Sequence, residues 1–365
     1  MEHIIKYYPV GNADCTLIKL DNGKTIIVDC QILADLTDGH GKQVMFDVKA
    51  DLLKELKKDG LGRPFVDLFI STHPHDDHCK GFAGNFYQGK VDDYDKDKNK
   101  DEIIIEELWI TPRGLNNNLS SPAGDIRKEA KRRRKLYDDD KNFFGSKGNY
   151  LRIIGYDKDK EFDRRYCYVP GILVTTVHGS SLSWLEIFIH APFKEDVETS
   201  KKYDNKNATS VVVQFGFKID GYTGYKSRVL MGGDAEHEIW QHILDNNTDE
   251  EKLRWNIFLA PHHCSWSFFN EPENKKEIKP SAPIHGHAVL IFPIDANLVF
   301  YGFQAFDSHI WIMRQPEKHI QIMQIKDFPE FGESFRDFAS PFFQIVQLIK
   351  NCTFSIFRPD GNTGT

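Results

Sequence analysis

The stretch "FISTHPHDDHCKG", Phe69 to Gly81, crowds titratable side chains onto one short turn. Three histidines and two aspartates occupy the six positions from His73 to His78, directly behind a run of apolar residues. Adjacent groups of like charge repel one another, and a buried charge is costly unless another group neutralises it. A bound cation would neutralise the cluster, so the stretch predicts a metal site at the end of a buried strand.

The composition is that of a folded protein. Of the 365 residues, 40% are hydrophobic and 13% are aromatic, which is enough for one large core or two smaller ones. We expect a single domain over residues 1–365. The formal net charge of -7 provides no overall basic surface, so binding of nucleic acid would need a local basic patch.

Cysteine usage and the N-terminal residues bear on the cellular compartment. The six cysteines form no CxxC pair and no regular spacing, which is typical of reduced thiols. The opening "MEHIIKYYPVG" lacks the apolar run of a signal peptide, and no stretch reaches the ~20 apolar residues of a membrane span. The sequence therefore predicts a cytoplasmic protein without a membrane segment.

Apolar runs and turn residues divide the chain into strands and helices. "CTLIKL" and "KTIIVDC" flank an Asp-Asn-Gly turn, the pattern of a β-hairpin. Residues 46–60 have the spacing of a helix that Gly60 would end, and residues 235–246 predict a second helix. Further β-like runs lie at 66–71, 103–111, 184–189, 209–219, 227–233, 254–260, 287–294 and 353–359. Interspersed strands and helices predict an α/β or α+β fold with more than one sheet layer.

Two segments differ in character from the rest. Residues 88–165 are dense in charge, and we interpret them as an insertion within the domain that carries one exposed helix at 127–137. Residues 300–365 are expected to form a C-terminal extension that covers the core or forms a homo-oligomer face, with an amphipathic stretch at 333–350.

Aspartates and histidines recur where the predicted strands end. The positions are Asp29, the turn with His73, His75, Asp77 and His78, then His190, Asp234, and the pair His262 and His263. Imidazoles and carboxylates are the ligands that two borderline cations need, and the ends of strands hold such ligands rigidly. The repetition predicts a site with two metals at one edge of a sheet.

The order of these motifs resembles the metallo-β-lactamase-fold superfamily. "HPHDDH" matches its HxHxDH motif, and "YPVGNADCTLIKLDNGKTIIVDC", "LMGGDAE" and "APHHCS" look like motifs of the hydrolase domain in ComEC-type DNA-uptake proteins and their stand-alone relatives. Ala13 and Cys264 stand where those motifs have glycine, and the transmembrane segments of the channel proteins are missing. The resemblance implies a four-layer αββα sandwich with a two-metal site at one rim.

The resemblance also implies a role for each residue of the site. His73, His75 and His190 would bind the first metal. Asp77, His78 and His262 would bind the second, with Asp234 bridging the two; His262 is favoured over His263, which stays an alternative. Asp29, and with it Asp14, would orient the ligands from behind, as the hydrogen-bond partners of metal-bound imidazoles do. The cations are expected to be zinc, with manganese as the alternative.

Metals of this kind supply hydrolytic chemistry. A divalent cation lowers the pKa of a water molecule from about 15.7 toward about 7 and so provides a nucleophile at neutral pH. Asp77 or Asp234 would hold the nucleophile and accept its proton, and His263 would protonate the leaving group.

Three functions are consistent with this chemistry. The motif set favours a phosphodiesterase or nuclease that acts on nucleic acid or nucleotides, with Arg132, Arg133 and Arg134 of the basic helix as substrate contacts. The same nucleophile would attack a carbonyl carbon, so a hydrolase of thioesters, lactones, β-lactams or peptides is the alternative. A metal-stabilised binding module within a larger complex, with a protein partner, is the third.

Overall fold

The computed structural model covers the whole chain and describes most of its N-terminal three quarters. The described residues are 3–269 except 11–12, 38–39, 44, 157–161, 219–226, 248–251, 253–254, 256 and 260, together with the backbone of the strands at 288–292, 303–305, 308–314, 320–325, 354–357 and 363–364. Within this part of the chain, no helix has the length and apolar character needed to cross a membrane.

The first sheet has ten strands and begins with the predicted hairpin. Its order is β20-β19-β18-β1-β2-β3-β4-β5-β6-β7. The bounds are β1 His3–Tyr7, β2 Thr16–Lys19, β3 Thr25–Val28, β4 Phe65–Ile70, β5 Ile104–Ile110, β6 Tyr150–Ile154, β7 Cys167–Tyr168, β18 Ile320–Ile325, β19 Phe354–Phe357 and β20 Thr363–Gly364. β2 and β3 pair antiparallel around Gly23, whose φ of 78° suits the predicted Asn-Gly turn, and β3 to β7 are parallel.

The second sheet has eight strands in the order β16-β17-β15-β14-β13-β12-β11-β8. The bounds are β8 Leu173–Val174, β11 Leu185–Ala191, β12 Val212–Phe217, β13 Ser227–Met231, β14 Ile257–Leu259, β15 Ala288–Phe292, β16 Phe303–Ala305 and β17 Ser308–Arg314. β11, β12 and β13 are antiparallel, whereas β13, β14, β15 and β17 are parallel. A separate hairpin joins β9 Thr176–Val177 to β10 Ser180–Ser181.

The helices are short, apart from one. They are α1 Val48–Glu55, α2 Asp76–Cys79, α3 Ser121–Asp139, α4 Lys194–Tyr203, α5 His237–Asn246 and α7 Trp266–Phe269, with 3-10 turns η1 Val91–Asp93, η2 Pro112–Leu115, η3 Asn207–Thr209 and η4 Pro261–Cys264. The Asp47 side chain caps α1 by accepting from the Ala50 N–H at 2.9 Å, and a proline stands in the first turn of α3.

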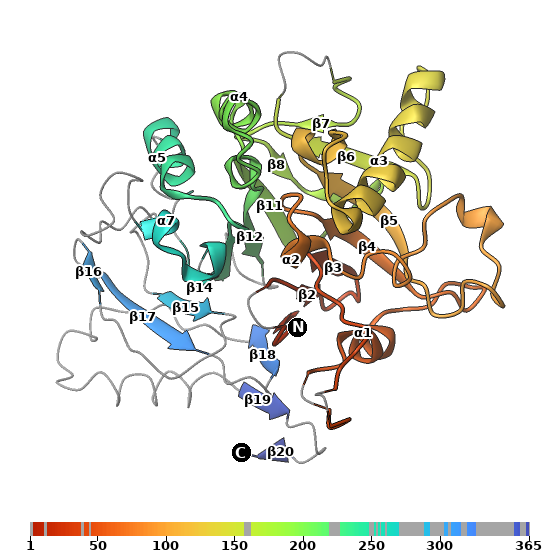
Figure 1. Ribbon diagram of the computed structural model, residues 1–365, viewed down its shortest axis with the longest axis horizontal. Coiled ribbons are helices and arrows are strands. Elements are labelled where there is room, and N and C mark those ends of the chain that lie inside the picture. The colour runs from red at the N-terminus through yellow and green to blue at the C-terminus, as the bar shows by residue number, and fades with distance from the viewer. Residues whose placement is uncertain are drawn as a thin grey trace.

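Three buried clusters define four layers. The cluster between the sheets joins Ile26 and Leu68 of the first sheet to Val213 and Phe215 of the second. Outside the first sheet, α1 and α3 bury their apolar faces, and outside the second sheet α5 does so with Trp240. Figure 1 shows α5 and α7 beside the second sheet and α1 and α3 on the other side of the molecule. The predicted αββα sandwich is therefore confirmed.

The first helix ends earlier than its sequence indicates. Leu56 already has extended backbone, with φ -76° and ψ 144°, so Gly60 is not its C-cap. The chain instead turns at Asp59, whose side chain accepts from the N–H groups of Leu61 and Arg63 at 2.9 and 3.0 Å. A local side-chain turn has taken the place of the last helical turn.

The charged segment is built into the first sheet. Residues 88–165 supply β5 and β6 as well as α3, and α3 buries Ile126, Ala130 and Tyr137, so only its other face is exposed. The described strands after residue 300 extend both sheets, and Figure 1 shows the N-terminus beside β18. The amphipathic stretch at 333–350 lies outside the described residues, and the domain boundaries stay a prediction.

The basic side chains of α3 serve the fold. Arg133 is 1% exposed; its guanidinium binds Glu129 at 2.7 Å and the backbone oxygens of Tyr150 and Ile105, both at 2.9 Å. Arg132 binds the same Glu129 carboxylate at 2.6 Å. The structure gives no support to the predicted contact of Arg133 with a substrate, because this guanidinium is buried and already bound.

Replacing Glu129 by alanine is expected to lower the free energy of unfolding by about 3–5 kcal/mol, because the buried Arg133 charge loses its carboxylate. Asp139→Ala on the same helix removes only the exposed partner of Lys135 and should change stability by less than about 1 kcal/mol. Urea unfolding followed by circular dichroism measures both. Equal effects of the two substitutions would contradict this account of α3.

Candidate metal centre

Parallel strands bring the predicted ligands to one edge of the sandwich. β3 and β4 run parallel in the first sheet, as β13 and β14 do in the second, so each pair ends at the same edge of its sheet. Asp29 follows β3, and the turn with His73 to His78 follows β4. Asp234 follows β13, and His262 and His263 follow β14. The two sheets meet there, with His78 Nε2 3.0 Å from Asp234 Oδ1.

Gly233 allows this close approach. Its φ is 49°, and a Cβ atom at this position would lie 2.6 Å from Thr72 Oγ1 and 2.8 Å from Thr72 Cβ. The Gly233 carbonyl accepts from the His262 N–H at 2.9 Å, and the Thr72 carbonyl accepts from the Val211 N–H at 2.9 Å. Glycine before Asp234 thus lets the two sheets join at the site.

One group of possible ligands consists of His73, His75 and Asp234, whose ligand atoms lie within 4.8 Å of one another. His73 Nε2 is 3.4 Å from Asp234 Oδ2 and 3.0 Å from His75 Nδ1. Burial and the neighbouring His78 lower the pKa of His73. Burial, then the charges of His73 and Lys206, lower the pKa of His75 to about 4.

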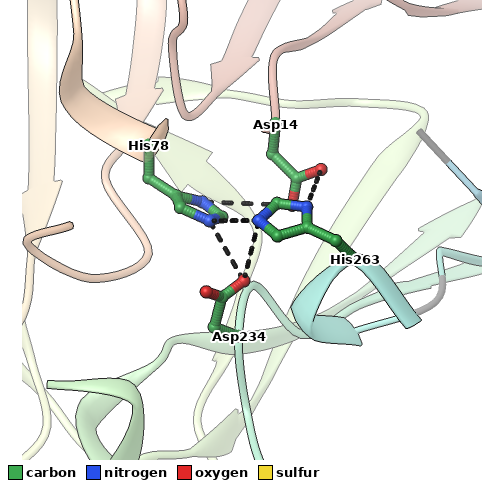
Figure 2. A group of neighbouring side chains, drawn as sticks. All are labelled: Asp14, His78, Asp234 and His263. Atoms are coloured by element: carbon green, nitrogen blue, oxygen red, sulfur yellow. Dashed lines mark hydrogen bonds and ion pairs between the residues drawn. The ribbon is translucent and has the colours of Figure 1, made fainter. Parts of the chain in front are cut away.

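A second group consists of Asp14, His78, Asp234 and His263, again within 4.8 Å. Figure 2 shows Asp14 and Asp234 on opposite sides of the two rings. The Nε2 atoms of His78 and His263 lie 3.0 and 3.6 Å from Asp234 Oδ1. Asp77 Oδ2 is 3.2 Å from His263 Nε2, which adds a fifth member on the same side as Asp234.

Asp29 and Asp14 lie behind the rings, at their Nδ1 atoms. His78 Nδ1 donates to Asp29 Oδ2 at 2.8 Å, and Asp29 also accepts from the Thr72 N–H at 2.7 Å and the Thr72 hydroxyl at 2.6 Å. Asp14 oxygens lie 3.9 Å from His78 Nδ1 and 3.8 Å from His263 Nδ1, and burial raises the pKa of Asp14 to about 6. Asp29 thus makes the hydrogen bond expected of an orienting group, whereas the contacts of Asp14 are too long for hydrogen bonds and its orienting role stays a prediction.

The neighbouring charges shift the pKa values of the group. Burial would raise the pKa of Asp234, but His78 and His73 outweigh it and hold this pKa well below its usual range. Burial would also raise the pKa of Asp77, but the hydrogen bond from His263 and the charge of His78 outweigh it and lower this pKa to about 2. Burial would lower the pKa of His78, but Asp234 and Asp29 raise it well above its usual value.

These contacts fit a cation better than a proton. Because His78 Nδ1 donates to Asp29, Nε2 of a neutral ring carries a lone pair, and it faces both Asp234 Oδ1 and, at 3.3 Å, His263 Nε2. A single proton would form a hydrogen bond between only two of these three atoms, whereas a single cation would bind all three. Asp234 Oδ1 is buried and makes no ordinary hydrogen bond with any residue that the structure describes.

A third group offers an instructive contrast. Asp67, Glu106 and His178 also lie within ligand distance of one another. There, Lys24 Nζ lies 3.6 Å from Asp67 Oδ1 and Lys147 Nζ 3.0 Å from Glu106 Oε1, so lysines already balance the carboxylates. No lysine or arginine forms an ion pair with Asp14, Asp29, Asp77 or Asp234 among residues 3–269 as far as they are described. Of the three groups found among the described residues, the two around Asp234 are those whose carboxylates no described lysine or arginine balances.

His190 is not brought to either group. It lies in the irregular end of β11, between Ile189 and Ala191, and its ring centroid is 4.7 Å from that of Phe188. Burial, followed by the charge of Lys252, lowers its pKa to about 3. Both of its ring nitrogens are buried without a hydrogen-bond partner among the described residues, so its predicted place beside His73 and His75 stays a prediction.

The two adjacent histidines after β14 take different positions. His263, not the favoured His262, lies in the group with His78. Its Nε2 faces Asp77 and Asp234, which favours a ligand over the predicted proton donor. His262 Nε2 is 3.8 Å from Asp234 Oδ2.

Two residues near the site were not singled out from the sequence. Thr72 binds the Asp29 carboxylate through its N–H and its hydroxyl. Its place directly before the histidine turn is the feature of the sequence that could have identified it. Lys206 has no such signal, because its nearness to His75 arises only in the folded chain. Arg132 and Arg134 of α3 remain 25% and 29% exposed and pair with Glu129 and Asp138.

Comparison with known proteins gives a limited result. No protein-family model matches the chain, and neither does any curated protein. Among solved structures, isothiocyanate hydrolase from Delia radicum gut bacteria is 11% identical, with 70% of each chain covered and a TM-score of 0.31. Unliganded yeast PDE1 is 12% identical, with 85% of this chain and 97% of that chain covered and a TM-score of 0.38. At these scores, the description of the fold rests on the strands and cores given above.

Asp29→Asn is expected to weaken zinc binding by about 10- to 100-fold, because an amide cannot accept all three bonds that orient His78 and Thr72. Asp76→Asn is the matched control, since Asp76 is an exposed member of the same histidine turn and belongs to neither ligand group. Competition with a chromophoric chelator measures both affinities. If both variants bind zinc as the unchanged protein does, Asp29 has no orienting role.

Proposed function

We propose that the chain is a hydrolase that uses two divalent cations, zinc or alternatively manganese, to cleave phosphodiesters in nucleic acids or nucleotides. The observation that carries the proposal is the pair of ligand groups on the two oxygens of Asp234. His73 and His75 with Asp234 would hold one cation; His78, His263 and Asp77 with Asp234 would hold the other. Cations so bound supply an activated water and offset negative charge on the reacting oxygens.

The protein's own groups divide the remaining work. Asp77 keeps 35% of its side chain exposed, whereas Asp14, Asp29 and Asp234 keep 8%, 1% and 3%. Asp77 is therefore the carboxylate that an entering water reaches, and it is placed to orient that water and accept its proton. Asp234 holds the two ligand groups together, and Asp29 fixes His78 through its Nδ1 atom.

Lys206 favours an anionic substrate. It directly precedes η3. Burial and the charge of His73 lower the pKa of the His75 ring most, and the positive charge of Lys206 lowers it further. The Lys206 ammonium makes no hydrogen bond or ion pair with any side chain that the structure describes, and the residue is half-buried. A half-buried, uncompensated ammonium beside a metal ligand suits a phosphate better than a neutral carbonyl substrate.

A substrate panel tests the proposal. Purified protein with zinc or manganese is offered bis(p-nitrophenyl) phosphate, single- and double-stranded DNA, RNA, cyclic nucleotides, a thioester and a cephalosporin. We expect turnover of phosphodiesters and its loss in His75→Ala and Asp77→Ala, with Asp76→Ala as the active control. Turnover of the carbonyl substrates alone would overturn the phosphodiesterase proposal, and no turnover by a metal-loaded protein would favour a binding module.

Lys206→Ala is expected to raise KM for a phosphodiester by about 10- to 100-fold, the value of a hydrogen bond to a charged group. Lys202→Ala is the control, because Lys202 is exposed and stacks on the ring of Tyr203, 4.7 Å from its centroid. Steady-state kinetics at constant ionic strength measures both. A KM that is unchanged in Lys206→Ala would show that this lysine does not bind the substrate.

A further inference from the structure

Lys206 stands between two asparagines that bind the same carboxylate. Asn205 Nδ2 donates to Glu236 Oε2 at 2.9 Å, and Asn207 Nδ2 donates to Glu236 Oε1 at 3.3 Å. The Asn205 side chain also accepts from the Asn207 N–H at 2.9 Å, which closes a turn around the lysine. Each oxygen of Glu236 is therefore bound by a residue that adjoins Lys206.

The backbone on either side of this turn is also held. Before it, Asp204 has left-handed backbone, with φ of 52°, and forms an ion pair with Arg113, which is 8% exposed. After it, the Lys206 carbonyl accepts from the Thr209 N–H at 3.1 Å and from the Thr209 hydroxyl at 2.9 Å. The segment from 204 to 209 thus has contacts along its whole length, while the Lys206 ammonium has none with a described side chain.

The same segment reaches the histidine turn. The Val211 N–H donates to the Thr72 carbonyl at 2.9 Å, one residue before His73. The charge of Lys206 contributes, after burial and the charge of His73, to the lowered pKa of His75. Lys206 is therefore held close to the first group of ligands.

Glu236 belongs to a fixed part of the site. It follows Asp234 by two residues and directly precedes α5, where its carbonyl accepts from the N–H groups of Ile239 and Trp240 at 3.0 and 3.3 Å. Trp240 is fully buried in the cluster outside the second sheet. The Glu236 side chain therefore extends from an anchored backbone, and a carboxylate on such a support can set the position of the segment that binds it.

The charges explain why amides, and not the ammonium, bind this carboxylate. Among the described residues, Glu236 pairs with no lysine or arginine, and its remaining contact is His262 Nδ1 at 3.6 Å, a nitrogen that lies closer to Ser267 Oγ, at 2.7 Å. An ion pair with Glu236 would neutralise Lys206 and hold it away from a substrate. Because the two asparagine amides bind both carboxylate oxygens, the ammonium keeps its charge for another anion.

We propose that Glu236 is a positioning residue, which through Asn205 and Asn207 holds the Lys206 ammonium where it binds a phosphate group of the substrate. This role rests on the proposed phosphodiesterase function, and it adds the group that fixes the lysine. Glu236 then has two opposite effects on an anionic substrate. Its negative charge repels the substrate directly, whereas its hold on Lys206 favours binding.

Steady-state kinetics with bis(p-nitrophenyl) phosphate at constant ionic strength tests this role. We expect Glu236→Gln to raise KM about 3- to 30-fold with little change in kcat, because glutamine keeps an acceptor for only one of the two asparagines. Asn205→Ala, which removes one amide, should raise KM by less. The matched control is Glu238→Gln, which removes an exposed charge from the first turn of α5 and should leave KM unchanged.

A double variant shows whether Glu236 acts through Lys206. In Lys206→Ala/Glu236→Gln, the second substitution should not raise KM further, because no ammonium is left to position. An unchanged or lower KM in Glu236→Gln overturns the positioning role, and so does an equal increase with and without Lys206. Loss of zinc from Glu236→Gln, measured with a chromophoric chelator, also overturns it, because the carboxylate would then act on the metal centre.

Hydrogen exchange distinguishes failure of this role from failure of the proposed function. In Glu236→Gln, the amides of residues 207–211 should exchange at least about 10-fold faster than in the unchanged protein and in Glu238→Gln, because the segment has lost its anchor. Equal exchange in the two variants overturns the positioning role, whatever the substrate. If the unchanged, metal-loaded protein cleaves no phosphodiester, the proposed function and the binding of substrate by Lys206 fail, while faster exchange would still support Glu236 as the anchor of this segment.

Discussion

The carboxylate of Asp234 is the constraint on which the site depends. It is 2% exposed and faces imidazoles on both oxygens, and none of the described lysines or arginines pairs with it. A buried charge of this kind requires a neutralising partner of comparable strength. In the group around Asp67, lysine provides that partner; at Asp234 only rings do, and their nitrogens converge on the same oxygens as ligands of a metal would.

The fold supplies this convergence through ordinary strand geometry. Parallel strands in each sheet end at one edge, so the residues after them arrive side by side although they are far apart in sequence. Gly233 lets the end of β13 lie against Thr72, and Thr72 in turn binds Asp29, which holds His78. Through these contacts, the end of β13 in the second sheet helps to fix the ligands that follow β4 in the first sheet.

Much of the fold and of the candidate site could be predicted from the sequence. Apolar runs marked the strands and polar residues at their ends marked the edge, so more than one sheet layer and the grouping of His73, His75, His78 and Asp234 could be predicted from the residues. The four-layer αββα order was predicted only from the resemblance to a known superfamily. The position of His190 could not be predicted, because no sequence pattern indicates the irregularity at the end of β11 where this residue lies.

The choice between His262 and His263 depended on left-handed backbone, which sequence preferences assign to glycine or asparagine rather than to histidine. The basic run of α3 was predicted to be exposed, but Glu129 and two backbone carbonyls bind the buried Arg133. In both cases tertiary contacts, which have no local pattern, decided the outcome.

The central claim is that two cations share the carboxylate of Asp234. Anomalous diffraction from crystals grown with zinc, recorded on both sides of the zinc absorption edge, tests it most directly. The account predicts two peaks, one beside each oxygen of that side chain, with the histidine turn between 73 and 78 contributing to both. A single peak, or peaks that leave Asp234 without a metal contact, would contradict it.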